Sequence, residues 1–174
     1  PKLNMNEINK KDSLGRSALM YAIRNEDVAV ADQLLSMDGI DANSADSMGQ
    51  TCLMLASEKN LDQIVQKLLP KLSQESINKR NNLGWNAFHW ACLGNSDKVL
   101  KLMFDKESIY KFDFNAQTNY GNTGFIYACY HKNEKAVDLI LANYQHHQID
   151  LKHKNINGKS GMDFWPNKFK GMNI

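Results

Sequence analysis

One stretch of the chain occurs five times in altered form. Its clearest copy runs from Gly84 to Cys92 and reads Gly-Trp-Asn-Ala-Phe-His-Trp-Ala-Cys. The glycines that begin successive copies are separated by 34, 35, 37 and 37 residues. These glycines are Gly15, Gly49, Gly84, Gly121 and Gly158. Self-similarity at this period indicates a solenoid, in which each unit buries its apolar face only against its neighbours.

Each copy predicts a short helix that packs closely against the next one. A side chain able to cap a helix N-terminus stands two residues after each glycine. These residues are Ser17, Thr51, Asn86, Thr123 and Ser160. Two bulky apolar columns follow, and Trp90 in the second column is predicted to belong to the core. An alanine comes next in the first four copies, and a small residue there lets two helices approach each other.

A second amphipathic helix is predicted in each of the first four units, because apolar residues recur there with helical spacing, as in Val28–Leu35. The break before it carries residues that tolerate the left-handed conformation. These are Asn25, Asn60, Gly94-Asn95 and Asn133. The segment after the second helix varies in length and leads, in the first four units, to Asn-x-x-Asp-x-x-Gly or a close variant. This pattern indicates an extended arm and a tight turn, here called a finger.

The units resemble the ankyrin repeat, which has a Gly-x-Thr-Pro-Leu-His-x-Ala signature and an Asn-x-x-Asp-x-x-Gly approach. The resemblance covers Ile8 to about Phe164. It implies an all-α solenoid of helix-turn-helix units joined by β-turn or hairpin fingers. The histidine is present only as His89, where the family makes hydrogen bonds between repeats. The proline is replaced in every unit, by Ala18, Cys52, Ala87, Gly124 and Gly161. The tetratricopeptide repeat is the alternative helix-pair fold, but it lacks the finger.

These boundaries predict a single domain, residues 1–174, with four full repeats and a partial fifth. The approximate units are 8–41, 42–76, 77–113, 114–150 and 151–174, called units 1 to 5, and residues 1–7 are an N-terminal extension. We expect that extension to be frayed. The fifth unit has residues for a first helix but not for a second, so it either caps the stack or marks a truncation.

Several classes of function are disfavoured by the sequence. No phosphate loop, nucleophile elbow or zinc-protease motif occurs, so we expect no enzyme, cofactor or metal. The net charge of +2 argues against nucleic-acid binding. No apolar run could span a bilayer and no signal peptide is visible, which predicts a cytoplasmic protein. We interpret Cys52, Cys92 and Cys129 as apolar filler in a reducing compartment, and His146, His147 and His153 as solvated loop residues.

The ankyrin resemblance implies that the fingers and the exposed side of the first helices form a concave binding surface, called here the concave face. Apolar and aromatic residues there resemble interaction hot spots. The predicted partner-binding residues are Leu14, Arg16, Met48, Gln50, Leu83, Trp85, Leu93, Tyr120, Asn122 and Tyr130. The alternative for Leu14, Met48 and Leu83 is that the fingertips pack on each other and stiffen the solenoid.

The sequence therefore predicts a non-enzymatic adaptor or scaffold that binds a protein or peptide and is monomeric unless part of a complex. Two alternatives stay open: a dedicated inhibitor that occludes another enzyme's active site, and the interaction segment of a larger catalytic chain. The resemblance also suggests possible β-hydroxylation of three finger asparagines, Asn43, Asn78 and Asn115. The alternative is that each is simply a turn-forming side chain bonded to its finger backbone.

Overall fold

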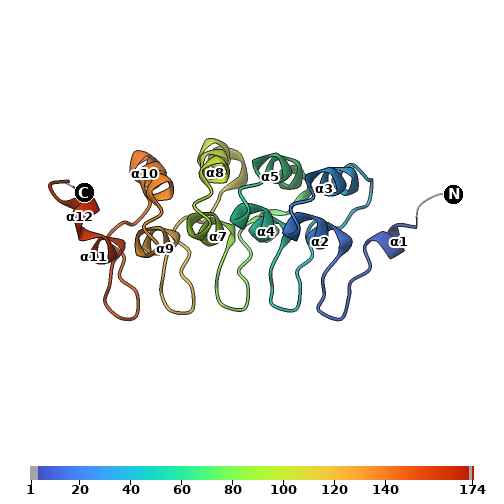
Figure 1. The fold of residues 1–174 in the computed structure, drawn as a ribbon, viewed down its shortest axis with the longest axis horizontal. Helices are drawn as coiled ribbons and strands as arrows, with labels where there is room; N and C mark the ends of the chain where they lie inside the picture. Colours follow the sequence, from blue (N-terminus) through green and yellow to red (C-terminus); the bar gives the residue numbers. More distant parts are fainter. Residues whose placement is uncertain (1–3, 173) are drawn as a thin grey trace.

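The computed structural model describes residues 4–172 and 174, and in it pairs of helices stack side by side in one row (Figure 1). The first helices are α2 (Ala18–Arg24), α4 (Cys52–Glu58), α7 (Ala87–Leu93), α9 (Gly124–Tyr130) and α11 (Gly161–Phe164). The second helices are α3 (Val28–Leu35), α5 (Asp62–Leu68), α8 (Asp97–Tyr110), α10 (Glu134–Asn143) and α12 (Pro166–Phe169). The prediction of an all-α solenoid is confirmed.

Three shorter elements complete the chain. Helix α1 (Met5–Ile8) precedes unit 1, and the 3-10 helix η1 (Leu69–Lys71) and helix α6 (Gln74–Ile77) lie in the connection after α5. Strand pairing in the described residues is limited to a single antiparallel bridge between Ala45 and Thr51, at the base of one finger. No described helix combines the length and the hydropathy that a bilayer crossing requires.

The first helices begin where the capping residues predict. In α2, α4, α7 and α9 the capping side chain accepts a hydrogen bond from the backbone N–H three residues later, at 3.1–3.4 Å. At α11 the side chain of the later residue is the acceptor instead: the Asp163 carboxylate accepts a hydrogen bond from the N–H of the capping residue, Ser160, at 2.7 Å. Each cap fixes where the chain leaves the finger and enters the helix.

The fingers are tight turns held by their own side chains. In unit 1 the Asp12 carboxylate accepts hydrogen bonds from the N–H groups of Leu14 and Arg16, at 2.9 and 2.8 Å. Gly15 donates its N–H to the Asp12 carbonyl with φ at +75°, a left-handed conformation that favours glycine. Units 2 and 3 repeat this turn with Asp46 and Asn81, which accept the equivalent N–H groups.

The break between the two helices differs in part from the prediction. The left-handed residue lies eleven positions after the glycine, at Asn60 and Asn95 in units 2 and 3. In units 1 and 4 this position is Glu26 and Lys132, with φ values of +58° and +54°. Asn25 and Asn133, which were predicted for this role, have negative φ. The geometry of the turn therefore decides which position is left-handed, even where the residue there, Glu26 or Lys132, does not favour that conformation.

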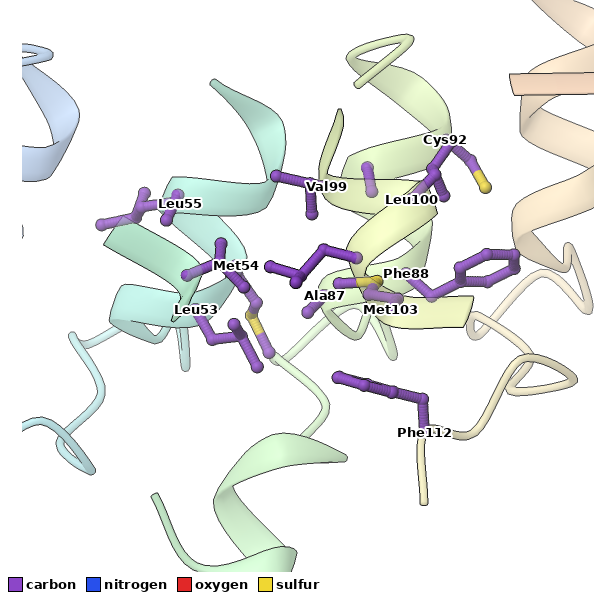
Figure 2. Close-up of a cluster of buried hydrophobic side chains, with 14 of the residues drawn as sticks. Leu53, Met54, Leu55, Ala87, Phe88, Cys92, Val99, Leu100, Met103 and Phe112 are labelled. Carbon is purple, nitrogen blue, oxygen red and sulfur yellow. The ribbon is translucent and has the colours of Figure 1, made fainter. Parts of the chain in front are cut away.

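The core runs along the interface between neighbouring helix pairs. Figure 2 shows the buried side chains Leu53 and Met54 of α4 on one side of α7, and the ring of Phe88 on the opposite side of that helix, directed toward unit 4. Burial of such a row is what makes each unit depend on its neighbours for stability.

The core also explains the residues that replace the family's proline. A Cβ atom at Gly124 would lie 2.7 Å from ring carbons of Phe88 and 3.0 Å from Cys92 Sγ. A Cβ atom at Gly161 would likewise lie 2.6 Å from the Phe125 ring. Where the preceding unit carries a large aromatic residue, the next helix must therefore begin with glycine. Leu53 in unit 2 is smaller, and Ala87 follows it.

Both ends of the array differ from the sequence prediction. Residues 5–7 of the extension, expected to be frayed, belong to α1, whereas residues 1–3 lie outside the described residues. Unit 5 was predicted to lack a second helix, but the one-turn helix α12 occupies that place (Figure 1). Its Phe169 is buried with its ring 5.9 Å from that of Phe125, and its Lys168 pairs with Asp138 of α10 at 2.7 Å.

Candidate functional site

The tips of the fingers are joined by a ladder of backbone hydrogen bonds. Ser47 donates its N–H to the Leu14 carbonyl at 2.9 Å, and the same bond recurs from each finger to the next. The side chains are left exposed: Leu14 by 45%, Met48 by 52%, Leu83 by 48% and Tyr120 by 61%. The fingers are joined by this backbone ladder and also by polar side chains, since Asn82 and Asn119 each donate from Nδ2 to a carbonyl of the preceding finger. Their apolar side chains remain available on the surface.

In units 1 and 2 the residues after the glycines lie in a polar network. The Arg16 guanidinium lies 6.0 Å from the centre of the Tyr21 ring, and the Tyr21 hydroxyl donates to Asp12 at 2.7 Å. Gln50 accepts a hydrogen bond from Arg24 Nη2 at 2.9 Å. This end of the concave face is charged and largely paired within itself.

In units 3 and 4 the corresponding positions build an aromatic cluster. The Trp85 ring lies 4.9 Å from that of Trp90 and 4.2 Å from that of Tyr127, measured between centroids. Trp85 is half-buried between these rings and not freely exposed. Trp90, predicted to be core, packs against the buried cluster but is only half-buried and lies beside Trp85, so the core prediction describes only part of its surroundings.

The reason for this partial exposure lies in helix geometry. Residues three apart share a face of a helix, so Trp90 shares the face of Leu93, and Tyr127 shares that of Tyr130. Leu93 is half-buried at the C-terminus of α7, and Tyr130 is 59% exposed. The whole column of Trp90 therefore belongs to the concave face, with Leu55 as its one fully buried member in the described residues.

A pocket of about 240 Å³ opens on this face between units 4 and 5. Its walls include the rings of Tyr127, Tyr130 and Phe164 and the carboxamides of Asn122, Asn155 and Asn157. Sequence reasoning found Asn122 and Tyr130 but missed Tyr127 and Phe164, which it assigned to the core column. Asn155 Nδ2 donates to Asn122 Oδ1 at 2.8 Å, so the two fingers hold one wall of the pocket in place.

The finger asparagines form a second ladder between units. Asn78 donates from Nδ2 to the Lys111 carbonyl at 2.7 Å and accepts at Oδ1 from the Asp113 N–H at 2.8 Å. Asn43 and Asn115 make the same pair of bonds to the next arm, and so does Asn9. The amides therefore hold the arm of the neighbouring unit.

His89 makes the hydrogen bond between repeats that the resemblance implies. Its Nε2 lies 3.0 Å from the Asn122 carbonyl, and its Nδ1 completes a capping box with Asn86. Burial disfavours the charged ring and lowers the pKa of His89 to about 4. The ring is thus neutral at physiological pH and serves as a structural bridge.

The other residues with possible chemistry are structural. Cys52, Cys92 and Cys129 are buried free thiols, and burial raises the pKa of Cys52 and of Cys129 to about 12. His147, predicted to be solvated, packs between the rings of Phe104 and Phe114, with its side chain 5% exposed. In the described part of the chain no three metal-binding side chains come together.

Comparisons with known proteins agree with the geometry. A family model for ankyrin repeats (3 copies) matches residues 2–81 and 64–155. The ankyrin repeat domain-containing protein SAT10 of Stachybotrys chartarum (strain CBS 109288 / IBT 7711) is 26% identical over 98 residues. That alignment covers 56% of this chain but only 5% of the relative, so the chain spans a small part of the relative's length. With its fingers, paired helices and matching family model, the chain belongs to the ankyrin-repeat family.

Proposed function

We propose that this array is a non-catalytic binding module that holds a partner protein or peptide on its concave face. Ankyrin repeats in general are protein–protein interaction modules. One observation supports the proposal above the others: side chains suited to interaction hot spots are exposed on a face whose backbone is hydrogen-bonded from unit to unit. A surface fixed in this way loses little conformational entropy on binding.

The partner-binding residues proposed from the sequence fall into two groups. Leu14, Met48, Leu83 and Tyr120 are exposed at the fingertips, and Asn122 and Tyr130 line the pocket between units 4 and 5. Trp85 lies between them, packed on two other rings. We therefore assign the main contact to units 3 to 5, with Tyr130 as the best single probe because little of the core depends on it.

The test uses paired variants with similar exposed apolar area. Tyr130→Ala removes a side chain from the concave face, whereas Ile109→Ala removes one that is 63% exposed on α8, a second helix. Proteins captured from an extract by the wild type are compared with those captured by each variant, and the dissociation constant is then measured with the purified partner. We expect Tyr130→Ala alone to weaken binding. Equal binding by both variants contradicts the proposal.

The same complex separates an adaptor from an inhibitor. If the purified partner has an activity, an adaptor leaves that activity intact when the array is bound at saturating concentration. An inhibitor abolishes it at one-to-one stoichiometry. We propose the adaptor role, because the aromatic surface extends across units 3 to 5 and its pocket between units 4 and 5 is suited to receive a side chain of a partner.

A further inference from the structure

The charged residues are divided unevenly between the two sides of the array. The fingers and first helices (residues 9–25, 43–59, 78–94, 115–131 and 152–165) carry ten basic and four acidic residues, including all three arginines. The rest of the chain carries eleven basic and fifteen acidic residues. The small net charge therefore conceals a positive side, which holds the concave face, and a negative side. Such a division attracts acidic partners to the positive side.

Three of the four acidic residues on the positive side are held by backbone N–H groups. Asp12 and Asp46 accept the turn hydrogen bonds of their fingers, and Asp163 accepts from Ser160. The N–H groups of its own turn, with that of Arg16 first, lower the pKa of Asp12. The N–H dipoles offset part of these charges locally. Arg24, Lys59 and Arg80 are likewise engaged within the array, so the basic residues outside these contacts are the charges available to a partner.

Positive charge borders the aromatic pocket on one side. Lys154 and Lys159 flank the finger that supplies Asn155 and Asn157 to the pocket wall, and both are exposed. Neither ammonium group forms an ion pair within the described residues. The finger and first helix of unit 4, which form the other wall, carry no Asp, Glu, Lys or Arg.

The lining of the pocket favours an apolar or aromatic guest. Its three rings, Tyr127, Tyr130 and Phe164, supply a surface for dispersion and edge-to-face contacts. Its lining contains no carboxylate, and the lysines nearby oppose a cationic guest. The volume of about 240 Å³ is on the scale of one large side chain.

We infer that the partner is an acidic peptide segment, which places one aromatic or large aliphatic side chain in the pocket between units 4 and 5 and directs neighbouring carboxylates toward Lys154 and Lys159. This inference rests on the proposed function and adds the chemistry of the partner to it. Aromatic surface with positive charge also suits single-stranded nucleic acid. The absence of any cation on the unit 4 finger breaks the continuous track that a phosphate backbone requires, and this favours the peptide.

The test is a selection of displayed random peptides on the intact protein. We expect the enriched sequences to share one aromatic or large aliphatic residue with Asp or Glu beside it. A synthetic peptide of the enriched sequence is then titrated against four proteins: the wild type, Tyr130→Ala, the double variant Lys154→Glu/Lys159→Glu, and the matched control Lys101→Glu/Lys106→Glu on α8. Tyr130→Ala and Lys154→Glu/Lys159→Glu should each weaken binding about tenfold or more, and the control Lys101→Glu/Lys106→Glu should leave binding unchanged.

The outcomes distinguish this inference from the proposed function. If the peptides lack acidic residues, or bind the Lys154→Glu/Lys159→Glu variant normally, the inference of an acidic partner is wrong. The proposed binding module still stands in that case if Tyr130→Ala weakens binding of the same peptides. Peptides indifferent to Tyr130→Ala, or no enrichment at all, overturn both. A parallel titration with polyuridylic acid should show no binding that depends on Tyr130. If it does, a nucleic acid replaces the peptide and the inference fails.

Discussion

The concave face of units 1 and 2 and that of units 3 to 5 have the same backbone and opposite chemistry. In the first part Tyr21 bonds to Asp12 and Arg24 bonds to Gln50, so polar groups find their partners within the array. In the second part aromatic rings occupy the same columns and line an open pocket. The contrast teaches that repeat geometry decides where a side chain points, whereas the residue in each column decides whether the surface is already paired or can receive a partner.

The largest expected effect concerns His89, which has no counterpart in units 1 and 2, where the column holds Met20 and Met54. Its pKa is lowered to about 4, so as pH falls below about 6.5 the unfolded chain binds a proton that the native ring resists. The contribution of His89 to the free energy of unfolding is fully present above about pH 6.5. This contribution should fall by about 3 kcal/mol between pH 7 and pH 4.

His89→Met is the matched variant, because it installs the residue of the first two units. Chemical denaturation at several pH values should show a shallower loss of unfolding free energy in this variant than in the wild type. Carboxylates such as Asp12, whose pKa is lowered by the Arg16 N–H, contribute equally to both proteins and cancel. Identical pH slopes would mean that His89 binds a proton as readily in the folded state as in the unfolded state.

The second prediction compares two tyrosines on the concave face. Tyr130→Ala should weaken partner binding by about 2 kcal/mol, and Tyr21→Ala by less than about 0.5 kcal/mol, because Tyr21 is engaged with Asp12 in the polar part. Isothermal titration with the purified partner measures both. An equal loss for the two variants would extend the binding surface over the whole face.

The third prediction concerns the core beneath the aromatic part. Gly124→Ala should lower the unfolding free energy by about 1.5 kcal/mol, since the added methyl group meets the Phe88 ring. Adding Phe88→Leu should reduce that penalty, because the pair then resembles Leu53 with Ala87 in units 2 and 3. Urea denaturation of the four proteins gives the coupling free energy, and strict additivity would show that the two positions do not interact.

The smallest effect tests the asparagine ladder, which is the same in both parts. Asn43→Ala and Asn78→Ala should each cost about 1 kcal/mol of unfolding free energy, since each leaves a carbonyl and an N–H of the next arm without a partner. Similar values from the two variants would show that the ladder is independent of the surface chemistry. Widely different losses of unfolding free energy in the two variants would show that the contribution of the asparagine ladder depends on the core beside it.

Much of this architecture could be predicted from the sequence, because cap, apolar column and small residue recur in register. The His89 bond was implied by the ankyrin resemblance, and the exposure of Leu14, Met48 and Leu83 was one of two alternatives that the sequence left open. The column of Trp90 was assigned wholly to the core although most of its members are only partly buried, since apolar identity alone does not separate a core face from an aromatic surface. Its spacing of three from Leu93 carried the missing signal.

Other features depend on contacts that one sequence does not display. The burial of His147 arises from the rings of Phe104 and Phe114, which are distant in the chain. The left-handed conformation of Glu26 and Lys132 is imposed by the helix pair around them, against their own preference. The pocket between units 4 and 5 needs two fingers and two helices, and so appears only when neighbouring units are placed together.

The fit of the Phe88 ring over Gly124 also means that the repeats are not interchangeable parts. Copying residues 77–113 in tandem would set a second Ala87 under the first Phe88, where a methyl group has no room. Copying residues 42–76 would instead pack the Cys52 of the second copy against the Leu53 of the first. The same pairing of a cysteine with a leucine of the preceding unit already exists between Cys52 and Leu19. The array could thus be lengthened near its beginning more easily than near its middle.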